Sequence, residues 1–369
     1  LDMDLTTYNY DVKWFLPSIK ALDVVVGSQG KKQTNTNNGE EILIPDADVN
    51  QFGFFSLLKY PLKRFNFLAG VRYDVNTITT FETEAEHEEE HEEEHEEERI
   101  DPIDVNYAAI NGSFGATYQL APEWLIRTNL ATGFRAPNLA ELTSNGSHHG
   151  ALRYELGNPN LTTENNVELD LGLELNSKHI SWAFSGFYNR IHNFIYLNPK
   201  DSMVDGLQLF EYTQTDANLY GLETTIDIHP HRMHWLHFET QFAMLVDKKS
   251  DGSFLPRIPS NNLLNTFKVE LKDAKHLKNP FVSLGLNTVF EQNKIAENET
   301  STPAYALINA TIGGDLMVGK QALKFTVGVT NLLDQQYVNH LSRLKQNGIY
   351  NMGRNIVFGL KIPFQYKKS

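Results

Sequence analysis

The feature that most limits the possible folds of this sequence is an alternation of apolar and polar residues with a period of two. In several segments the alternation continues for ten or more residues. It is clear over residues 65–76, 167–176 and 355–364, and over the shorter stretch 323–330. Successive side chains of a strand point to opposite faces, so each segment predicts a strand with one apolar and one polar face. Helical periodicity is scarce, and no run of 18 apolar residues offers a transmembrane helix. The chain is therefore predicted to be all-β.

The length of these segments separates two all-β architectures. Strands of a soluble sandwich are usually about 5–6 residues long, whereas a tilted strand that crosses a membrane needs roughly 9–11 residues. Many segments here are longer than ten residues, and their polar faces are rich in Asp, Glu, Arg and Asn, as a water-filled lumen requires. We therefore expect an antiparallel transmembrane β-barrel.

The predicted strands are joined by connections that alternate between short and long. We expect about 15 strands, near residues 2–15, 20–30, 48–61, 64–82, 104–121, 123–135, 163–178, 180–197, 207–228, 234–247, 262–272, 279–291, 304–319, 321–332 and 350–365. The long connections are 31–47, 83–103, 136–162, 198–206, 248–261, 292–303 and 333–349. Outer-membrane barrels have short periplasmic turns and longer extracellular loops, so we predict that these long loops are extracellular.

The charge of the chain is concentrated in one segment. The formal net charge is -14, but 12 of the 46 acidic residues lie between Glu82 and Glu98, which leaves 34 acids against 32 Lys and Arg elsewhere. An acidic chain does not favour a nucleic-acid partner, and the absence of cysteine excludes disulfides and thiolate ligands. The acidic segment formally contains an H-E-x-x-H pattern, but it lacks the apolar back face of a peptidase helix, so we predict no enzyme.

Three ordered motifs resemble those of one family. Residues 133–142, Gly-Phe-Arg-Ala-Pro-Asn-Leu-Ala-Glu-Leu, resemble the "GFRAPxxxEL" signature of TonB-dependent outer-membrane receptors. Residues 329–337 are similar to their "xNLxDxxY" element, and residues 353–359 to their closing "GRxxxxG" strand. The resemblance spans essentially the whole chain. It implies structural roles for the motif residues Arg135, Pro137, Asn138, Glu141, Asn331, Asp334 and Arg354.

The resemblance also implies a 22-stranded barrel with an N-terminal plug inside it, in the outer membrane of a Gram-negative bacterium and driven by the TonB–ExbB–ExbD complex. Our 15 strands are about seven short, and no plug, TonB box or signal peptide is recognised. We therefore expect residues 1–369 to form the C-terminal part of a barrel, paired in lipid with the missing N-terminal strands, because unpaired edges there are costly. Salt bridges to the missing plug and a generally charged lumen are both open interpretations of the lumen-facing residues Arg72, Arg127, Arg135 and Glu174.

The acidic segment also carries the first candidate metal ligands. His87, His91 and His95 recur every four residues among glutamates. Imidazole and carboxylate groups suit Zn²⁺, Ni²⁺ or Cu²⁺. Like charges four residues apart oppose a free helix, so metal binding would have to drive folding there. The alternative is a solvated acidic loop that its own charge keeps disordered.

The second candidate site follows the first family motif. Residues 146–157 resemble a "GxHxAxxxxExG" segment of the zinc-uptake branch of the family, with Gly150 where Ala is usual. The resemblance implies that His148 and Glu155 bind metal, and a loop can turn the adjacent His149 inward as a further ligand; the alternative is ordinary loop surface. His229, His231, His234 and His237 surround a short turn, where interfacial polar residues are the favoured interpretation and a metal site the lesser one; His340, on the last long loop, is a further candidate.

The sequence thus predicts TonB-dependent uptake of a scarce metal, zinc first, with the metal as transported ligand and no catalytic cofactor. The first rival is an iron-siderophore or haem receptor, which the acidic tract disfavours because it would repel an anionic chelate. A non-transporting surface adhesin and a soluble carbohydrate-binding sandwich are rivals of other classes.

Overall fold

The computed structural model describes residues 2–38, 42–82, 102–148, 153–230, 233–319 and 321–363. No helix in these ranges is long and apolar enough to cross a bilayer. The elements are β1 (Met3–Phe15), β2 (Asp23–Asn37), β3 (Ala47–Leu62), β4 (Phe65–Thr80), β5 (Asp104–Ala121), β6 (Trp124–Arg135), α1 (Leu139–Thr143), β7 (Asn145–His148), β8 (Arg153–Leu156), β9 (Glu164–Asn176), β10 (Ile180–Val204), β11 (Leu207–Ile228), β12 (Leu236–Lys249), β13 (Asn262–Glu270), β14 (Leu277–Val289), β15 (Tyr305–Val318), β16 (Gln321–Thr330), the 3₁₀ helix η2 (Lys345–Asn347) and β17 (Asn355–Lys361).

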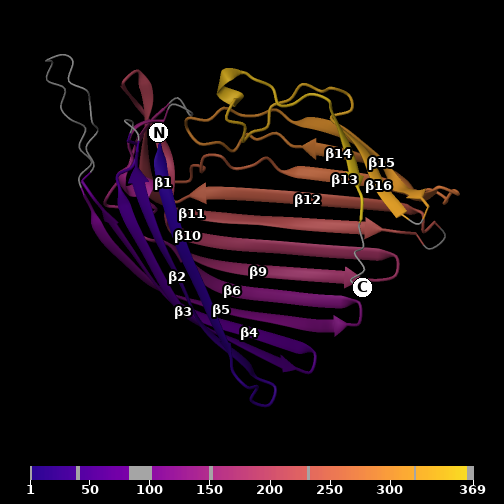
Figure 1. The fold of residues 1–369 in the computed structure, drawn as a ribbon, viewed down its shortest axis with the longest axis horizontal. Coiled ribbons are helices and arrows are strands. Elements are labelled where there is room, and N and C mark those ends of the chain that lie inside the picture. The colour runs from indigo at the N-terminus through magenta and orange to yellow at the C-terminus, as the bar shows by residue number, and fades with distance from the viewer. Residues whose placement is uncertain are drawn as a thin grey trace.

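Fifteen of these strands form one antiparallel meander. Each pairs with the next along the chain, except that β6 pairs with β9, so the short β7–β8 hairpin is not part of the wall. The strands curve round into a trough, and no ladder joins β1 to β17 within the described part of the chain (Figure 1). The all-β, antiparallel barrel prediction is confirmed, and the main wall has the predicted number of strands.

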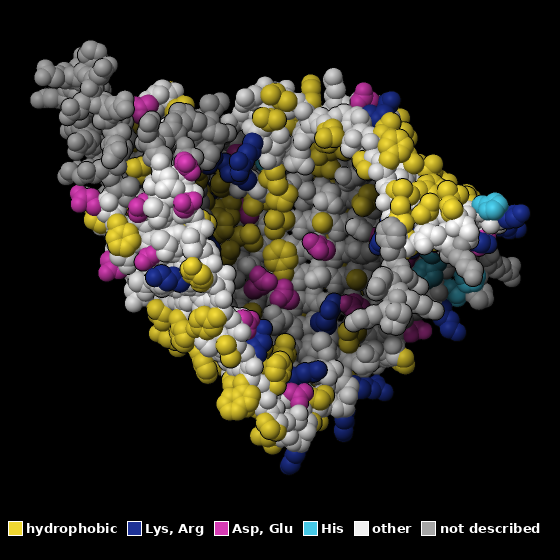
Figure 2. Space-filling view, viewed as in Figure 1, with side chains coloured by type: hydrophobic (Ala, Val, Ile, Leu, Met, Phe, Trp, Pro, Cys, Tyr) yellow, Lys and Arg dark blue, Asp and Glu magenta, His cyan; other side chains and the backbone are white. Residues whose placement is uncertain are grey.

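The wall is a single layer with two different faces. Leu169 and Leu171 of β9 are about half exposed on the outside, and Phe358 of β17 is 77% exposed. Figure 2 shows hydrophobic side chains gathered along the outside of the first strands and charged side chains inside the trough. No second sheet covers the apolar face of the described strands. The alternative of a soluble sandwich is therefore wrong.

The two rims of the wall differ, as the loop lengths predict. Turns such as 63–64 and 122–123 form one rim, and the longer connections that follow β4, β6 and β16 leave the wall and return to it at the other. One predicted long loop, 198–206, is wrong: β10 and β11 run through it and close in a two-residue turn at Asp205 and Gly206, which have φ of 51° and 74°. Two consecutive residues with positive φ are typical of the tight turns that match strand twist.

The buried core lies at the long-loop rim. A hydrophobic cluster contains Ile78 of β4, Leu142 of α1, Ile195 of β10 and Leu161, which lies just before β9. Ile103 packs against this cluster. Burying this cluster fixes the 136–163 connection onto the end of the barrel wall, because apolar area removed from water stabilises the packed state.

Candidate ligand-capture site

The 136–163 connection is folded rather than irregular, and its first part is a capped helical turn. Pro137 is fully buried in front of α1. Asn138 accepts a hydrogen bond from the backbone N–H of Glu141 (2.9 Å), and the carboxylate of Glu141 accepts one from the backbone N–H of Asn138 (2.8 Å). This reciprocal pair satisfies N–H groups that the start of a helix leaves unpaired. The first family motif therefore encodes a local structure.

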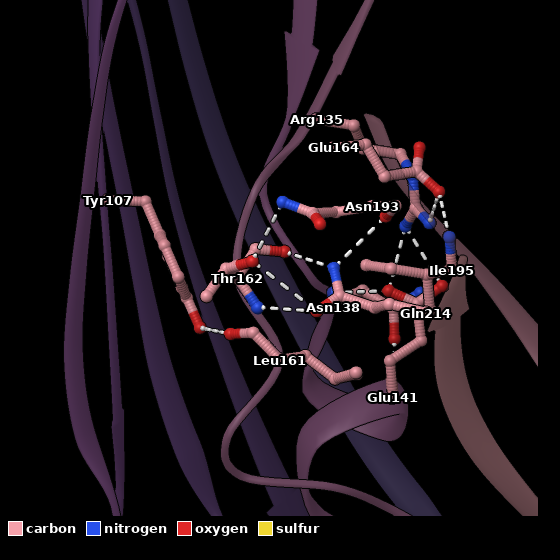
Figure 3. Close-up of polar contacts among 10 residues, drawn as sticks. All are labelled: Tyr107, Arg135, Asn138, Glu141, Leu161, Thr162, Glu164, Asn193, Ile195 and Gln214. Atoms are coloured by element: carbon pink, nitrogen blue, oxygen red, sulfur yellow. Dashed lines mark hydrogen bonds and ion pairs between the residues drawn. The ribbon is translucent and has the colours of Figure 1, made fainter. Parts of the chain in front are cut away.

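Arg135 links this helical turn to the barrel wall. Its Nε and Nη2 atoms each donate to Glu164 at 2.8 Å, and Nη1 donates to both oxygens of Glu141 at 2.9 and 2.7 Å (Figure 3). The side chains of Glu141 and Glu164 are only 10% and 13% exposed. A planar guanidinium can bridge two carboxylates in this way, and such charge-assisted pairs are stronger than neutral hydrogen bonds. Arg135 is thus the joint between α1 and β9.

A second set of hydrogen bonds fixes the end of the connection to the neighbouring strands. Gln214 of β11 donates to the carbonyls of Thr162 and Asn193 at 2.7 and 3.0 Å, and accepts from the backbone N–H of Thr162 (Figure 3). Tyr107 of β5 donates to the carbonyl of Leu161 at 3.1 Å. Strands β5, β10 and β11 therefore hold the end of the connection where it enters β9.

The β7–β8 hairpin carries the second predicted metal site. β8 pairs in parallel with β11, which places Glu155 beside Phe210. Glu155 is 4% exposed; one carboxylate oxygen accepts from Nε of Arg153 at 2.7 Å and the other faces the hydroxyl of Tyr212 at 3.3 Å. Metal binding by Glu155 would therefore require Arg153 to move away. The backbone of His148 pairs with Arg153 at the end of β7.

The other predicted ligands lie outside the described residues. This holds for His87, His91, His95 and His149, and only the backbone of His148 is described. What the structure does place is the pair of positions from which the acidic tract leaves the wall. The N–H of Thr80 donates to the carbonyl of Ile103 at 2.9 Å, and Ile78 and Ile103 belong to the cluster that holds Leu142 of α1. Both predicted metal-binding segments therefore start from one support.

The C-terminal motif forms a similar local lock. Asn331 is 2% exposed; its side-chain amide donates to the carbonyl of Gln335 at 2.9 Å and its oxygen accepts from the N–H of Gln335 at 2.8 Å. Asp334 accepts from the N–H of Arg354 at 2.7 Å, and Nε of Arg354 donates to the carbonyl of Leu332 at 2.8 Å. These bonds close the connection between β16 and β17, as a structural role requires.

The lumen-facing residues have partners within the wall. Arg72 lies 2.6 Å from Asp74 on the same strand, and Arg127 pairs with Glu174 across the β6–β9 ladder. These pairs are partly exposed to the trough, so each is worth little to stability. Whether they also contact a plug stays a prediction.

His340 is a buried histidine in the last long loop, and its place in that loop was the only reason to consider it from sequence. Its Nδ1 lies 2.9 Å from the hydroxyl of Thr302 and 3.3 Å from Nζ of Lys345, and its Nε2 lies 3.9 Å from a carboxylate oxygen of Glu299. An ammonium can only donate, so Nδ1 acts as acceptor and the ring is neutral. Burial and the positive charge of Lys345 lower the pKa of His340, against the opposing effect of Glu299.

This lowered pKa predicts that acid loosens the last long loop. The unfolded loop takes up a proton near pH 6.5, whereas the folded loop resists protonation to lower pH. The stability of the loop is therefore complete above pH 6.5 and falls as the pH drops toward the lower pKa of the folded state. We expect amide exchange of Ser342 and Gly348, normalised for intrinsic rate, to speed up between pH 7.5 and 5.5. H340Q should abolish that pH dependence, and the same dependence in H340Q would exclude His340 as its cause.

At the opposite rim, the structure brings together three side chains that could bind a metal ion, and two of them, His229 and His237, were candidates from sequence. Asp227, His229 and His237 have potential ligand atoms within 4.8 Å of one another. Sequence reasoning missed Asp227 because it sits in the strand that precedes the turn, where an acidic residue on the polar face is ordinary.

Comparisons with known proteins agree with this architecture. The chain resembles the copper transporter OprC at a TM-score of 0.76 and 17% identity, over 96% of this chain and 56% of that one. It resembles the FrpB iron transporter from Neisseria meningitidis at 0.72 and 12%, over 97% and 55%. For the ferric yersiniabactin uptake receptor FyuA from Yersinia pestis the values are 0.71 and 14%, over 98% and 55%. The chain thus spans about half the length of these structures.

Sequence comparison gives the family directly. A stretch of 108 residues is 26% identical to the vitamin B12 transporter BtuB of Photobacterium profundum, which is 29% of this chain and 16% of that protein. The sequence profile of the family described as "TonB dependent receptor-like, beta-barrel" matches residues 4–332. Together with the 15-stranded wall, this match shows that the chain belongs to the TonB-dependent receptor β-barrel family.

Proposed function

We propose that this chain forms most of the barrel wall of an outer-membrane transporter that takes up a scarce metal ion, zinc first, either free or as a chelate. In this proposal the exposed apolar face contacts lipid, and the trough is the lumen through which cargo passes. Energy comes from a TonB–ExbB–ExbD complex acting on a plug, as the family membership suggests. The long-loop rim faces outside the cell.

The observation that carries the metal assignment is the shared support of the two histidine-rich segments. The acidic tract leaves the wall next to Ile78 and Ile103, and the β7–β8 hairpin leaves it behind Leu142, which packs on the same cluster. Because both segments start from one support, their ligands are at a high effective concentration relative to one another, which favours binding of one ion between them. Imidazole and carboxylate donors together suit Zn²⁺ better than they suit hard cations such as Ca²⁺.

A second candidate cargo is a ferric chelate, because FrpB is an iron transporter and FyuA a ferric yersiniabactin uptake receptor by name. A multivalent anionic chelate would have to approach 12 glutamates between residues 82 and 98. Like charges repel at the range of a Debye length, about 10 Å at 0.1 M salt, so this segment slows the approach of such a ligand. Zinc is therefore the better candidate.

The test is uptake of radioactive zinc at limiting concentration by cells that carry the full-length protein. Replacing His87, His91, His95, His148 and His149 with Ala should lower the initial rate at least tenfold. H276A is the control, because His276 is exposed in the turn between β13 and β14, at the rim opposite the proposed site. Equal zinc uptake by parent and the fivefold variant would exclude zinc capture by these residues. Uptake of a ferric chelate by both would then support the second candidate.

A further inference from the structure

The short-turn rim carries a cluster of metal-ligand side chains far from the proposed capture loops. Asp227 lies near the end of β11, His229 follows that strand directly, and His237 is the second residue of β12. Figure 2 shows histidine side chains gathered at the rim where this turn lies. Glu155 in the capture region lies beside Phe210, 17 residues back along β11 from Asp227. At ~3.3 Å per residue, that separation is about 55 Å.

The strand register explains why these three side chains meet. Ile228 pairs with Phe238 and Asp227 with Glu239, so the next step of the same register brings His229 opposite His237. Residues two apart on a strand share a face, so Asp227 lies on the same face as His229. Their ring centroids confirm the approach of the two histidines, at 5.9 Å.

The atoms of this cluster lack the partners that buried polar groups normally have. Oδ1 of Asp227, Nδ1 of His229 and Nε2 of His237 are shielded from solvent and make no hydrogen bond in the described part of the chain. Oδ1 of Asp227 and Nδ1 of His229 are 3.6 Å apart, too far for a hydrogen bond between them. Buried polar atoms are almost always paired in native proteins. Three unpaired potential ligand atoms within 4.8 Å of one another are therefore placed to share one partner.

We propose that Asp227, His229 and His237 bind a divalent transition metal ion, with Zn²⁺ as the reference ion. Two imidazole nitrogens and one carboxylate oxygen form a donor set typical of zinc. Ligand bonds of about 2.0–2.2 Å place tetrahedral donors about 3.4 Å apart, so the present cluster has to contract by roughly an ångström on binding.

The fourth position of a tetrahedral ion has a candidate ligand in the next strand. Oε1 of Glu270, at the end of β13, lies 3.6 Å from Nε2 of His237, although it is also 2.7 Å from Nζ of Lys268. Either this carboxylate or water completes the coordination. With Glu270 as ligand, one ion connects β11, β12 and β13 at the short-turn rim, beside the turn that joins β11 to β12.

The experiment measures metal binding in a background that lacks the capture histidines. Full-length protein with His87, His91, His95, His148 and His149 replaced by Ala is purified in detergent, stripped with chelator and titrated with Zn²⁺ by calorimetry. We expect one equivalent of Zn²⁺ to bind, and D227N, H229Q and H237Q each to weaken binding at least 100-fold. H276Q is the matched control, since His276 is an exposed histidine in another turn of the same rim, and it should bind as its parent does.

A second measurement keeps the result independent of folding. Each variant is first checked for the heat-modifiable gel migration of an intact barrel, and Co²⁺ is added to the parent to record the intense visible bands of a tetrahedral site. Absence of any Zn²⁺ equivalent in the parent, or unchanged binding in folded H229Q and H237Q, overturns the proposal. Because the capture histidines are already absent, neither result depends on the proposed transport function.

Discussion

Replacing Arg135 with Ala is expected to release the folded 136–163 connection from the barrel wall. The change leaves two carboxylates, Glu141 and Glu164, close together, mostly buried and without their shared counter-charge. Removing one partner of a buried ion pair costs about 3–5 kcal/mol, and we expect the lower value because Arg135 is itself partly exposed. About 3 kcal/mol corresponds to local opening that is roughly 150-fold more frequent, measurable as exchange of the amides of Leu142 and Ser144.

The matched control is R127A on the same strand. Arg127 also faces the trough and also pairs with a glutamate, but its side chain and that of Glu174 are substantially exposed. Such a pair contributes at most about 1 kcal/mol, so exchange at Leu142 and Ser144 should not change. R135K should rescue poorly, because an ammonium cannot bridge two carboxylates as a planar guanidinium does. Equal exchange in R135A and R127A would show that Arg135 does not hold the connection.

Replacing Gly157 with Ala is expected to displace α1 by a steric route. A Cβ atom at this position would lie 2.5 Å from the backbone nitrogen of Thr143, 2.7 Å from the carbonyl carbon of Leu142 and 2.7 Å from the nitrogen of Ser144. All three obstacles are backbone atoms, so no side chain can rotate away. Forcing an extra carbon into packed structure typically costs about 1–3 kcal/mol, and the 2.6 Å bond from the Gly157 N–H to the Ser144 carbonyl would be strained as well.

Gly146 supplies the control for this substitution. A Cβ there meets nothing closer than the carbonyl oxygen of Ile42 at 3.4 Å, which is ordinary contact. We expect G157A to lower the proposed zinc uptake and to speed amide exchange at Ser144 at least tenfold, while G146A changes stability by less than about 0.5 kcal/mol. If G146A were as damaging as G157A, general fragility of the hairpin, and not this clash, would explain both.

The strands of the wall could be predicted from sequence because each depends on local alternation. The predicted segments 104–121 and 207–228 agree with β5 and β11 to the residue. The error at 198–206 arose because alternation weakens where β10 leaves the region that requires one apolar face. There the hairpin is set by the positive φ of Asp205 and Gly206 and by the β8–β11 ladder, which only the folded chain reveals.

The candidate sites were predictable only where their partners are close in sequence. Arg135 and Glu141 belong to one motif, but Glu164 lies 29 residues from Arg135, and only the β6–β9 pairing brings them together. The contact of Glu155 with Tyr212, 57 residues away, likewise depends on docking of the hairpin. A regular alternation predicts on which face of the sheet a side chain lies, but it does not predict which residue of a distant segment will contact that side chain.

The β10–β11 hairpin, with strands of 25 and 22 residues, has a consequence for how the protein meets large objects. A membrane crossing uses only about 9–11 residues of each strand. In the proposed orientation the remaining residues of the hairpin therefore extend beyond the bilayer on the outside of the cell. The tip of the hairpin, Asp205 and Gly206, would lie beyond the bilayer, where an arriving antibody or phage can touch it. Selection by such encounters would first change residues that neither line the lumen nor connect the 136–163 segment to the wall through Arg135.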